Sequence, residues 1–209
     1  MSNQDYKNQA LAALKGNWAP AVLAMIVYVI ISGLVETPNV LNELKIVNLW
    51  YAAPITLAGM LLIVPFALGL MNAYKELLHG DNRVTGNAFR IAFCGGNYLH
   101  ILWGYILMLI KLFLWYLLLI IPGIIKCFSY ALTPYILVDE PELSALQAIK
   151  KSRKMMKGHK FDLFWLFLSF IGWIILCIFT LGLGALWLGP YMYTSYAAFY
   201  EDVKAGYQE

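Results

Sequence analysis

Long apolar runs separated by short polar segments make up most of this chain. The runs with few or no charges lie at residues 18–35, 53–74, 98–121, 124–138, 161–179 and 185–200. A helix rises about 1.5 Å per residue, so roughly 20 apolar residues cross a hydrocarbon core about 30 Å thick. The pattern predicts an all-α, polytopic helical membrane protein with about six transmembrane helices, in a single integral membrane domain of residues 1–209.

The fourth run is short for a membrane span. At about 1.5 Å per residue, residues 124–138 reach only about 22 Å, less than the roughly 30 Å of hydrocarbon. Pro122-Gly123 precedes this run and is expected to turn the chain. Two interpretations stay open: either the turn lies below the outer surface, or the helix is a partial span buried against its neighbours.

Three amphipathic segments each precede a pair of apolar runs. They lie at residues 4–15, 87–93 and 142–157, and the third is strongly basic. Each ends beside a glycine, the residue that most readily adopts the left-handed conformation at a helix end: Gly16, Gly95 and Gly158. We therefore expect three helical hairpins, each led by an interfacial amphipathic helix.

The composition supports a membrane protein. Hydrophobic residues make up 61% of the chain and charged residues 13%, whereas a soluble domain is about 45–50% apolar and about 25% charged. Cys94, Cys127 and Cys177 have no paired or metal-like spacing, so the sequence predicts neither a disulfide framework nor a zinc site. The first apolar run lacks a convincing cleavage site and is expected to act as an uncleaved signal-anchor.

The positive charges favour one topology. With both termini in the cytoplasm, the outer loops carry only Lys45, while Lys111 and Lys126 lie within spans. The other twelve of the fifteen Lys and Arg then lie on the cytoplasmic side: Lys7, Lys15, Lys75, Arg83, Arg90, Lys150, Lys151, Arg153, Lys154, Lys157, Lys160 and Lys204. This asymmetry follows the positive-inside rule and predicts a multi-pass protein with both termini cytoplasmic.

The start of the basic segment is expected to be a helix N-terminus. Asp139 and Glu140 precede Pro141, which suits the first helical position. The acids at this end and the bases at the other complement the helix dipole. Although acidic groups including Glu142 could serve a hydrolytic or metal role at this surface, helix capping explains them better.

The basic segment is a candidate lipid-binding helix. It has an apolar stripe at helical spacing, formed by Leu143, Leu146, Ile149 and Met156. We expect it to lie in the inner interface, with its cations among anionic phospholipids at about 1 kcal/mol per Lys or Arg. The alternative is a solvated face that only fixes the topology. The expected headgroup contacts are Lys150, Lys151, Arg153, Lys154 and Lys157.

Two lysines within spans are candidate ligand-binding residues. Lys111 lies near the middle of the third run, where a charge costs about 2.5–3.5 kcal/mol on insertion scales. It is expected to face protein or a wet cavity, where it would serve as an anion or proton site. The alternative is that the long aliphatic part of its side chain lets the ammonium group reach a carbonyl group or the interface. Lys126, near the start of the fourth run, is placed to extend toward the outer surface.

Three tyrosines lie on one face of the last helix. Tyr193, Tyr196 and Tyr200 have the spacing of a helical stripe. Packing and interface anchoring are the usual reason for such a stripe. A ligand groove is the alternative interpretation.

No pattern in the sequence predicts catalysis, a metal or a cofactor. A zinc-protease HExxH motif, a nucleophile elbow and a phosphate-binding loop are all absent. His79, His100 and His159 are too scattered to suggest a metal cluster.

The second half of the chain resembles a known bacterial family. The residues that carry the resemblance are IIPGIIKCFSYALTPYILVDEPELSALQAIKKSRKMMKGHK, then FDLFWLFLSFIGWIIL and TLGLGALWLGPYMYTSYAAFYED, and more faintly ALKGNWAPAV near the N-terminus. They resemble the small integral membrane proteins of domain of unknown function family 975. The basic segment is also distantly similar to the membrane domain found with some glycerophosphodiester phosphodiesterases. The resemblance implies a helical protein of the bacterial cytoplasmic membrane and carries no catalytic residues.

These observations favour a non-enzymatic function. The leading hypothesis is an accessory or lipid-organising membrane protein whose partners are the bilayer and its anionic phospholipids, with no nucleic acid. A second copy of the chain or another membrane protein is a further candidate partner. The alternatives are a small transporter or channel with Lys111 in its path, and a lipid-modifying enzyme.

Overall fold

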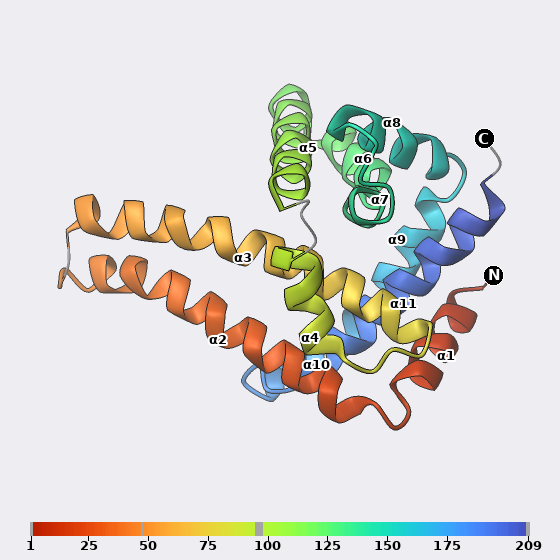
Figure 1. Cartoon of the computed structure of the whole chain (residues 1–209), viewed down its shortest axis with the longest axis horizontal. Coiled ribbons are helices and arrows are strands. Elements are labelled where there is room, and N and C mark those ends of the chain that lie inside the picture. The colour runs from red at the N-terminus through yellow and green to blue at the C-terminus, as the bar shows by residue number, and fades with distance from the viewer. Residues whose placement is uncertain (1, 47, 95–97, 208–209) are drawn as a thin grey trace.

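The protein folds as a bundle of helices. The computed structural model describes residues 2–46, 48–94 and 98–207, and this part of the chain contains no strand (Figure 1). The prediction of an all-α fold is therefore confirmed. The elements are α1 (Asn3–Leu14), α2 (Trp18–Glu43), α3 (Leu49–Leu78), α4 (Val84–Phe89), the π-helical turn η1 (Arg90–Cys94), α5 (Tyr98–Leu118), α6 (Ile120–Tyr130), α7 (Thr133–Asp139), α8 (Ala145–Met155), α9 (Lys160–Leu168), α10 (Ile171–Phe179) and α11 (Ala185–Gly206).

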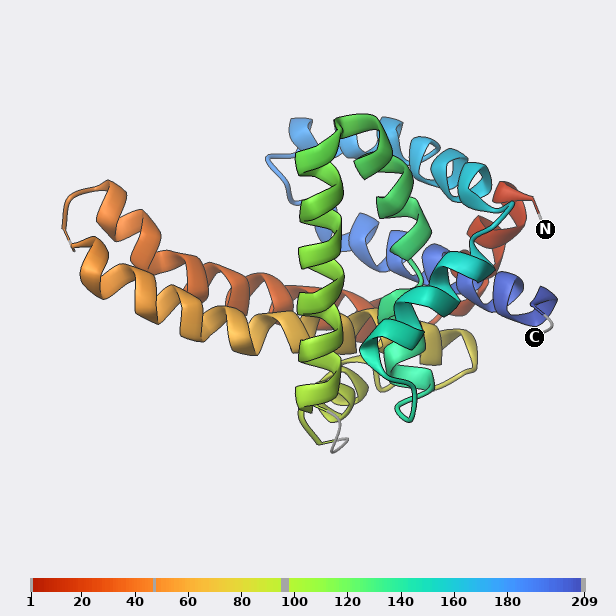
Figure 2. The same cartoon turned by 90° about the horizontal axis from the view of Figure 1, so that it is seen from above.

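Three hairpins organise these elements, as the sequence predicts. The α2–α3 hairpin extends away from the body in both views (Figures 1 and 2). The α5–α6 hairpin runs across the direction of the α2–α3 hairpin (Figure 2). The third hairpin joins α10 to α11. The expected short helices precede the hairpins: α1 the first, α4 with η1 the second, and α8 the third. Gly95, expected to end the second of these helices, lies outside the described residues.

Five helical segments in the described residues are long and apolar enough to cross a membrane. They are Trp18–Glu43, Leu49–Leu78, Tyr98–Leu118, Ile120–Asp139 and Lys160–Phe179. The fourth and fifth each consist of two helices, broken at residues 131–132 and 169–170. The protein is thus a polytopic helical membrane protein.

The sixth predicted span, residues 185–200, forms α11 but is not among these five. Gly189, Pro190 and four tyrosines make it less apolar than the other spans, and Glu201 and Asp202 lie in its last turns. It packs inside the body, where Phe199 and Tyr200 are completely buried, so the sixth crossing that two cytoplasmic termini require would be covered by other helices. Apolar residues in this helix therefore meet protein rather than lipid along much of its length.

Two large hydrophobic cores, and a smaller cluster of Met108, Tyr130 and Ile149, hold the described part of the body together. One surrounds α11 and includes Tyr135, Leu137 and Phe199. The other lies between α2, α3 and α4 and includes Phe66 and Tyr74. α1 completes both cores, because Tyr6 is buried in the first and Leu14 in the second.

Two predicted turns differ from the structure. Pro122-Gly123 lies in the first turn of α6, because the chain has already reversed around Leu119. Pro is tolerated there, where its missing N–H needs no partner. A Cβ on Gly123 would lie 2.7 Å from the ring of Tyr116, so glycine lets α6 approach α5 closely.

The second difference concerns α2, which does not end with the first apolar run at residue 35 but continues to Glu43. Within the helix, Thr37 donates a 2.8 Å hydrogen bond from its hydroxyl to the carbonyl of Gly33, so this polar group is satisfied without leaving the helix. Thr56 of α3 donates to Asn39 across the hairpin at 3.2 Å. These hydrogen bonds allow α2 and α3 to remain helical and in contact up to the polar tip of the hairpin.

Candidate functional site

The basic helix α8 begins later than the sequence predicts. Its N-cap is Ser144, whose hydroxyl accepts from the Gln147 N–H while the Gln147 side chain accepts from the Ser144 N–H. Pro141 lies in the turn before it, so the predicted helix start at Pro141 is wrong. The reciprocal cap made by Ser144 and Gln147 decides the boundary.

One face of α8 is fixed to the body of the protein. The buried positions are spaced three or four residues apart: Ala145, Ala148, Ile149, Ser152 and Met155. The Ser152 hydroxyl donates a 3.0 Å hydrogen bond to the carbonyl of Ser129 in α6. The predicted apolar stripe is therefore only partly right, because Ile149 and Met156 are buried against protein whereas Leu146 is 46% exposed.

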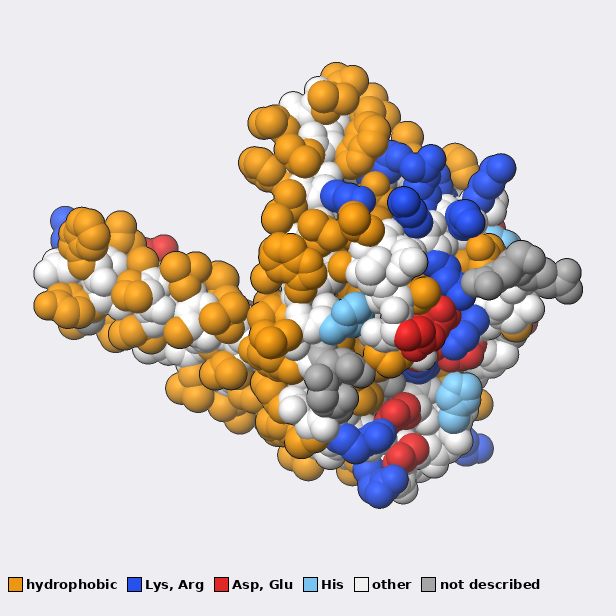
Figure 3. All heavy atoms as spheres, turned by 45° about the horizontal axis from the view of Figure 1, so that its top comes forward, with side chains coloured by type: hydrophobic (Ala, Val, Ile, Leu, Met, Phe, Trp, Pro, Cys, Tyr) orange, Lys and Arg blue, Asp and Glu red, His pale blue; other side chains and the backbone are white. Residues whose placement is uncertain are grey.

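The opposite face of α8 presents cations. We call it the basic face, and it consists of the exposed side chains of Lys150, Arg153 and Lys154 on α8 and of Lys157 in the turn that follows. Figure 3 shows Lys and Arg side chains gathered where Figure 1 places α8, beside the hydrophobic surface of the α5–α6 hairpin. Because the other side of α8 is buried, these charges are held in a fixed position relative to the apolar helices.

Lys151 and Lys126 are placed differently from these four cations. Lys151 forms an ion pair with Glu140 at 2.9 Å, and both side chains are largely buried. Lys126 Nζ lies 4.4 Å from the ring centroid of Trp115, a cation–π contact. The helix that carries it, α6, also contacts α8. The structure thus brings Lys126 toward α8.

Lys111 lies on α5 and is partly exposed. Among the residues that the structure describes, it makes no hydrogen bond or ion pair. It does not line the two main apolar cavities, whose walls come from other helices. Neither Lys111 nor Lys126 is among the residues that line these two cavities.

Asp139 joins three helices at the end of the body where the termini lie. It ends α7 and forms ion pairs with Lys75 of α3 and Lys204 of α11, while Tyr200 donates a 2.8 Å hydrogen bond to its Oδ2. The side chains of Lys75 and Asp139 are only 10% and 11% exposed. Asp139 therefore connects α3, α7 and α11, and does not cap the basic helix as predicted from the sequence.

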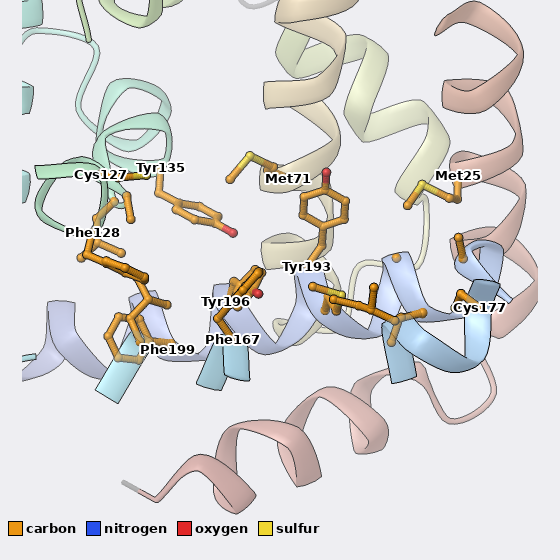
Figure 4. A pocket seen from close by; sticks show the side chains of 18 residues that line it. Met25, Met71, Cys127, Phe128, Tyr135, Phe167, Cys177, Tyr193, Tyr196 and Phe199 are labelled. Carbon is orange, nitrogen blue, oxygen red and sulfur yellow. The ribbon is translucent and has the colours of Figure 1, made fainter. Parts of the chain in front are cut away.

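A large apolar cavity lies in the middle of the body. Its volume is about 580 Å³, within the range of roughly 300–1,000 Å³ typical of ligand sites. Figure 4 shows its walls, to which α2, α3, α6, α7, α9, α10 and α11 contribute. The lining is dominated by methionine, leucine and aromatic side chains, including Met25, Met71, Phe167, Met192 and Phe199.

Three tyrosines contribute to this wall. Tyr135 comes from α7, and Tyr193 and Tyr196 come from α11 (Figure 4). Two of the three tyrosines predicted to share a face of the last helix thus meet in one cavity. The third, Tyr200, stacks on Tyr135 with ring centroids 4.8 Å apart and reaches Asp139 instead.

The hydroxyls of Tyr135 and Tyr196 are buried and have no hydrogen-bond partner in the described part of the chain. Tyr135 as a whole is only 2% exposed. A buried hydroxyl without a partner costs about 1–3 kcal/mol, so two at one cavity are unusual. Periodicity places both tyrosines on helices, but only the packing of α7 against α11 brings them together.

A comparison with protein families identifies the C-terminal part of the chain. Residues 117–206 match the model described as "Protein of unknown function (DUF975)". This part of the chain is similar to that family. The DUF975 region extends from the end of α5 to α11, so it contains the basic face, Asp139 and most of the cavity wall. The resemblance predicted from the sequence is confirmed over these residues.

The other comparisons add no relatives. No curated protein and no solved structure matches the chain. The distant similarity to the membrane domain of glycerophosphodiester phosphodiesterases therefore stays a prediction, as does the faint resemblance at residues 13–22.

Proposed function

We propose that this protein is a non-enzymatic protein of the bacterial cytoplasmic membrane that binds anionic phospholipid headgroups at the basic face of α8. The observation that carries the proposal is the arrangement of α8, which has one face buried against α5–α7, three exposed cations on the other face and a fourth, Lys157, in the turn after it. Cations held beside apolar helices suit an acidic headgroup whose acyl chains lie against those helices.

The expected topology supports the same interpretation. In the proposed orientation the termini and α8 lie on the cytoplasmic side, where the leaflet carries anionic lipids. Each exposed Lys or Arg near that surface contributes about 1 kcal/mol. Of the five predicted headgroup contacts, Lys150, Arg153, Lys154 and Lys157 are free to contribute in full, whereas Lys151 is partly neutralised by Glu140.

Lipid retention tests this proposal. The full chain is reconstituted in a mixture of phosphatidylglycerol and phosphatidylcholine, and the lipids retained after gentle extraction are counted by native mass spectrometry. We expect the wild type to retain phosphatidylglycerol preferentially and the Arg153→Gln/Lys154→Gln variant to lose most of this preference.

The matched control is Lys15→Gln/Lys45→Gln, which removes the same charge from two exposed lysines away from α8. It should retain the preference of the wild type. Equal loss in both variants would mean that net charge, rather than the basic face, determines lipid selection, and would contradict the proposal.

A further inference from the structure

The central cavity has the shape of a site for one hydrocarbon chain. On α11 its wall runs from Ala185 to Phe199, which at about 1.5 Å per residue is a length of roughly 21 Å. Dividing 580 Å³ by this length gives a mean cross-section of about 28 Å². Carbon atoms in contact lie about 3.5–4.0 Å apart, so a single chain occupies on the order of 15–20 Å². The cavity is therefore long and wide enough for one hydrocarbon chain.

The cavity is reached from the surface of the membrane spans. Cys127 of α6 and Phe167 of α9 line it and are also exposed. Both belong to segments apolar enough to cross a membrane. An occupant would thus enter from the bilayer between α6 and α9, which suits a lipid better than a water-soluble molecule.

The two unpartnered hydroxyls specify where the polar part of the occupant lies. Figure 4 shows Tyr135 and Tyr196 in the part of the cavity nearest Phe199, while Cys177 lines the opposite end. Both hydroxyl oxygens are covered by neighbouring side chains, so the phenol rings would turn toward the occupant to donate to its carbonyl oxygen, and satisfying two buried donors would stabilise the complex. The occupant should therefore carry an acceptor at one end of its chain.

The lining of the cavity disfavours a free fatty acid as its ligand. Among the residues that the structure describes, no Lys, Arg or His lines the cavity. Burying an ionised carboxylate without a cation is far more costly than burying a neutral ester, which needs only hydrogen bonds. A neutral ester linkage therefore fits the site better than a carboxylate.

From these observations we propose that the central cavity binds a lipid with one ester-linked acyl chain, whose ester carbonyl accepts hydrogen bonds from Tyr135 and Tyr196. This site is separate from the basic face and makes no demand on the charge of the headgroup. Its ligand is a monoacyl lipid, whereas the basic face selects lipids by their acidic headgroup.

The native cysteines provide the measurement. Cys127 and Cys177 line the cavity, whereas Cys94 is exposed and does not line it. The full chain in nanodiscs of diacyl phosphatidylcholine is treated with N-ethylmaleimide, and alkylation of each cysteine is followed by peptide mass spectrometry. Palmitoyl-lysophosphatidylcholine should slow the alkylation of Cys127 and Cys177 at least threefold and leave Cys94 unchanged.

A matched ligand and two variants test the role of the hydroxyls. The ether-linked hexadecyl analogue, which lacks the carbonyl, should require about tenfold more lipid for the same protection. Tyr135→Phe should remove this difference between ester and ether, and Tyr196→Phe serves the same purpose if the first variant does not fold. Tyr74→Phe is the control, because its hydroxyl already donates to the Ala21 carbonyl at 2.9 Å.

Three results would each overturn the proposal. They are equal protection of all three cysteines, no protection of any cysteine, and equal potency of the ester and ether lipids on the wild type. Because the lipid probe is zwitterionic, it should protect Cys127 and Cys177 of the Arg153→Gln/Lys154→Gln variant as well as it protects those of the wild type. Failure of this site and failure of the basic face can therefore be told apart.

Discussion

Tyr6 donates a 2.7 Å hydrogen bond from its hydroxyl to Oδ2 of Asp202, which fastens the first helix to the last. Its ring also packs edge-on against Phe199, with the centroids 5.5 Å apart. The two termini consequently lie near each other (Figure 2). Asp139 links α3 and α7 to α11 within the same body. The helix α1 and the ends of α3, α7 and α11, which the charge pattern predicts on one side of the membrane, are therefore packed together in the structure.

This arrangement predicts the result of a topology experiment. Reporter fusions at Lys154 and at both termini should report the cytoplasm, and a fusion at Asn39 near the α2–α3 tip should report the opposite side. The reason is that twelve of the fifteen Lys and Arg lie on the proposed cytoplasmic side. The same side for Asn39 and Lys154 is incompatible with this topology.

Tyr6→Phe should destabilise the protein while leaving the ring in place. The hydroxyl donates to a carboxylate, and such hydrogen bonds contribute about 1.5–3 kcal/mol. Thermal unfolding in detergent measures the change in the free energy of unfolding. Tyr51→Phe, which removes a hydroxyl from a side chain that is 66% exposed, is the control and should change little. Equal unfolding temperatures for Tyr6→Phe and wild type would mean that the bond contributes nothing.

The Tyr6 bond also has a pH dependence. Burial, together with the Asp202 carboxylate, raises the pKa of the Tyr6 hydroxyl above its ordinary value. A raised pKa means that the stabilisation is present in full below the unfolded value of about 10 and is lost as the pH rises toward the folded value. The difference between wild type and Tyr6→Phe should therefore be constant at neutral pH and shrink above pH 10.

Asp139→Asn should be more damaging than the loss of an exposed carboxylate. It leaves Lys75, which is 8% exposed, without its anionic partner. Removing one member of a buried pair typically costs about 3–5 kcal/mol. Asp81→Asn is the control, because Asp81 pairs with the exposed Arg83 at 3.0 Å and such surface pairs contribute little. Chemical unfolding of the three proteins gives the comparison, and similar stabilities for the two variants would refute the role of Asp139.

Two glycines within helices should respond in opposite directions to alanine. A Cβ on Gly69 would lie 2.4 Å from the carbonyl oxygen of Ala88, a backbone atom that cannot swing away. Gly69→Ala should thus cost about 1–3 kcal/mol by separating α3 from α4. Gly33→Ala meets nothing within 4 Å and should stabilise α2 by about 0.5–1 kcal/mol. Unfolding temperatures test both, and a stabilised Gly69→Ala would show that α4 is not held so closely.

Apolar runs in the sequence predict the helices well, because a long charge-free run has few alternatives to a helix in lipid. They cannot distinguish a neighbouring lipid from a neighbouring helix. Residues 185–200 therefore look like a span, although α11 buries Phe199 and Tyr200 in protein. The same ambiguity affects α8, where the apolar positions Ile149 and Met156 face the body rather than lipid.

The candidate sites were partly visible in the sequence. The cations of α8 and the stripe of Tyr193 and Tyr196 follow from helical spacing. The pairing of Asp139 with Lys75 joins residues 64 apart, and the meeting of Tyr135 with Tyr196 joins two different helices. Neither relationship has a signal in one sequence, because both depend on how α3 and α7 pack on α11.

The preference of the full chain for anionic lipid tests the central claim most directly. Spin-labelled phosphatidylglycerol and phosphatidylcholine are added in turn to reconstituted protein, and the motionally restricted fraction gives their relative association constant. We predict a value above one at low ionic strength that falls toward one in 1 M salt, where charges are screened within about 3 Å. Arg153→Gln/Lys154→Gln should lower the value at low salt. A relative association constant of one for the wild type at low salt would contradict the account.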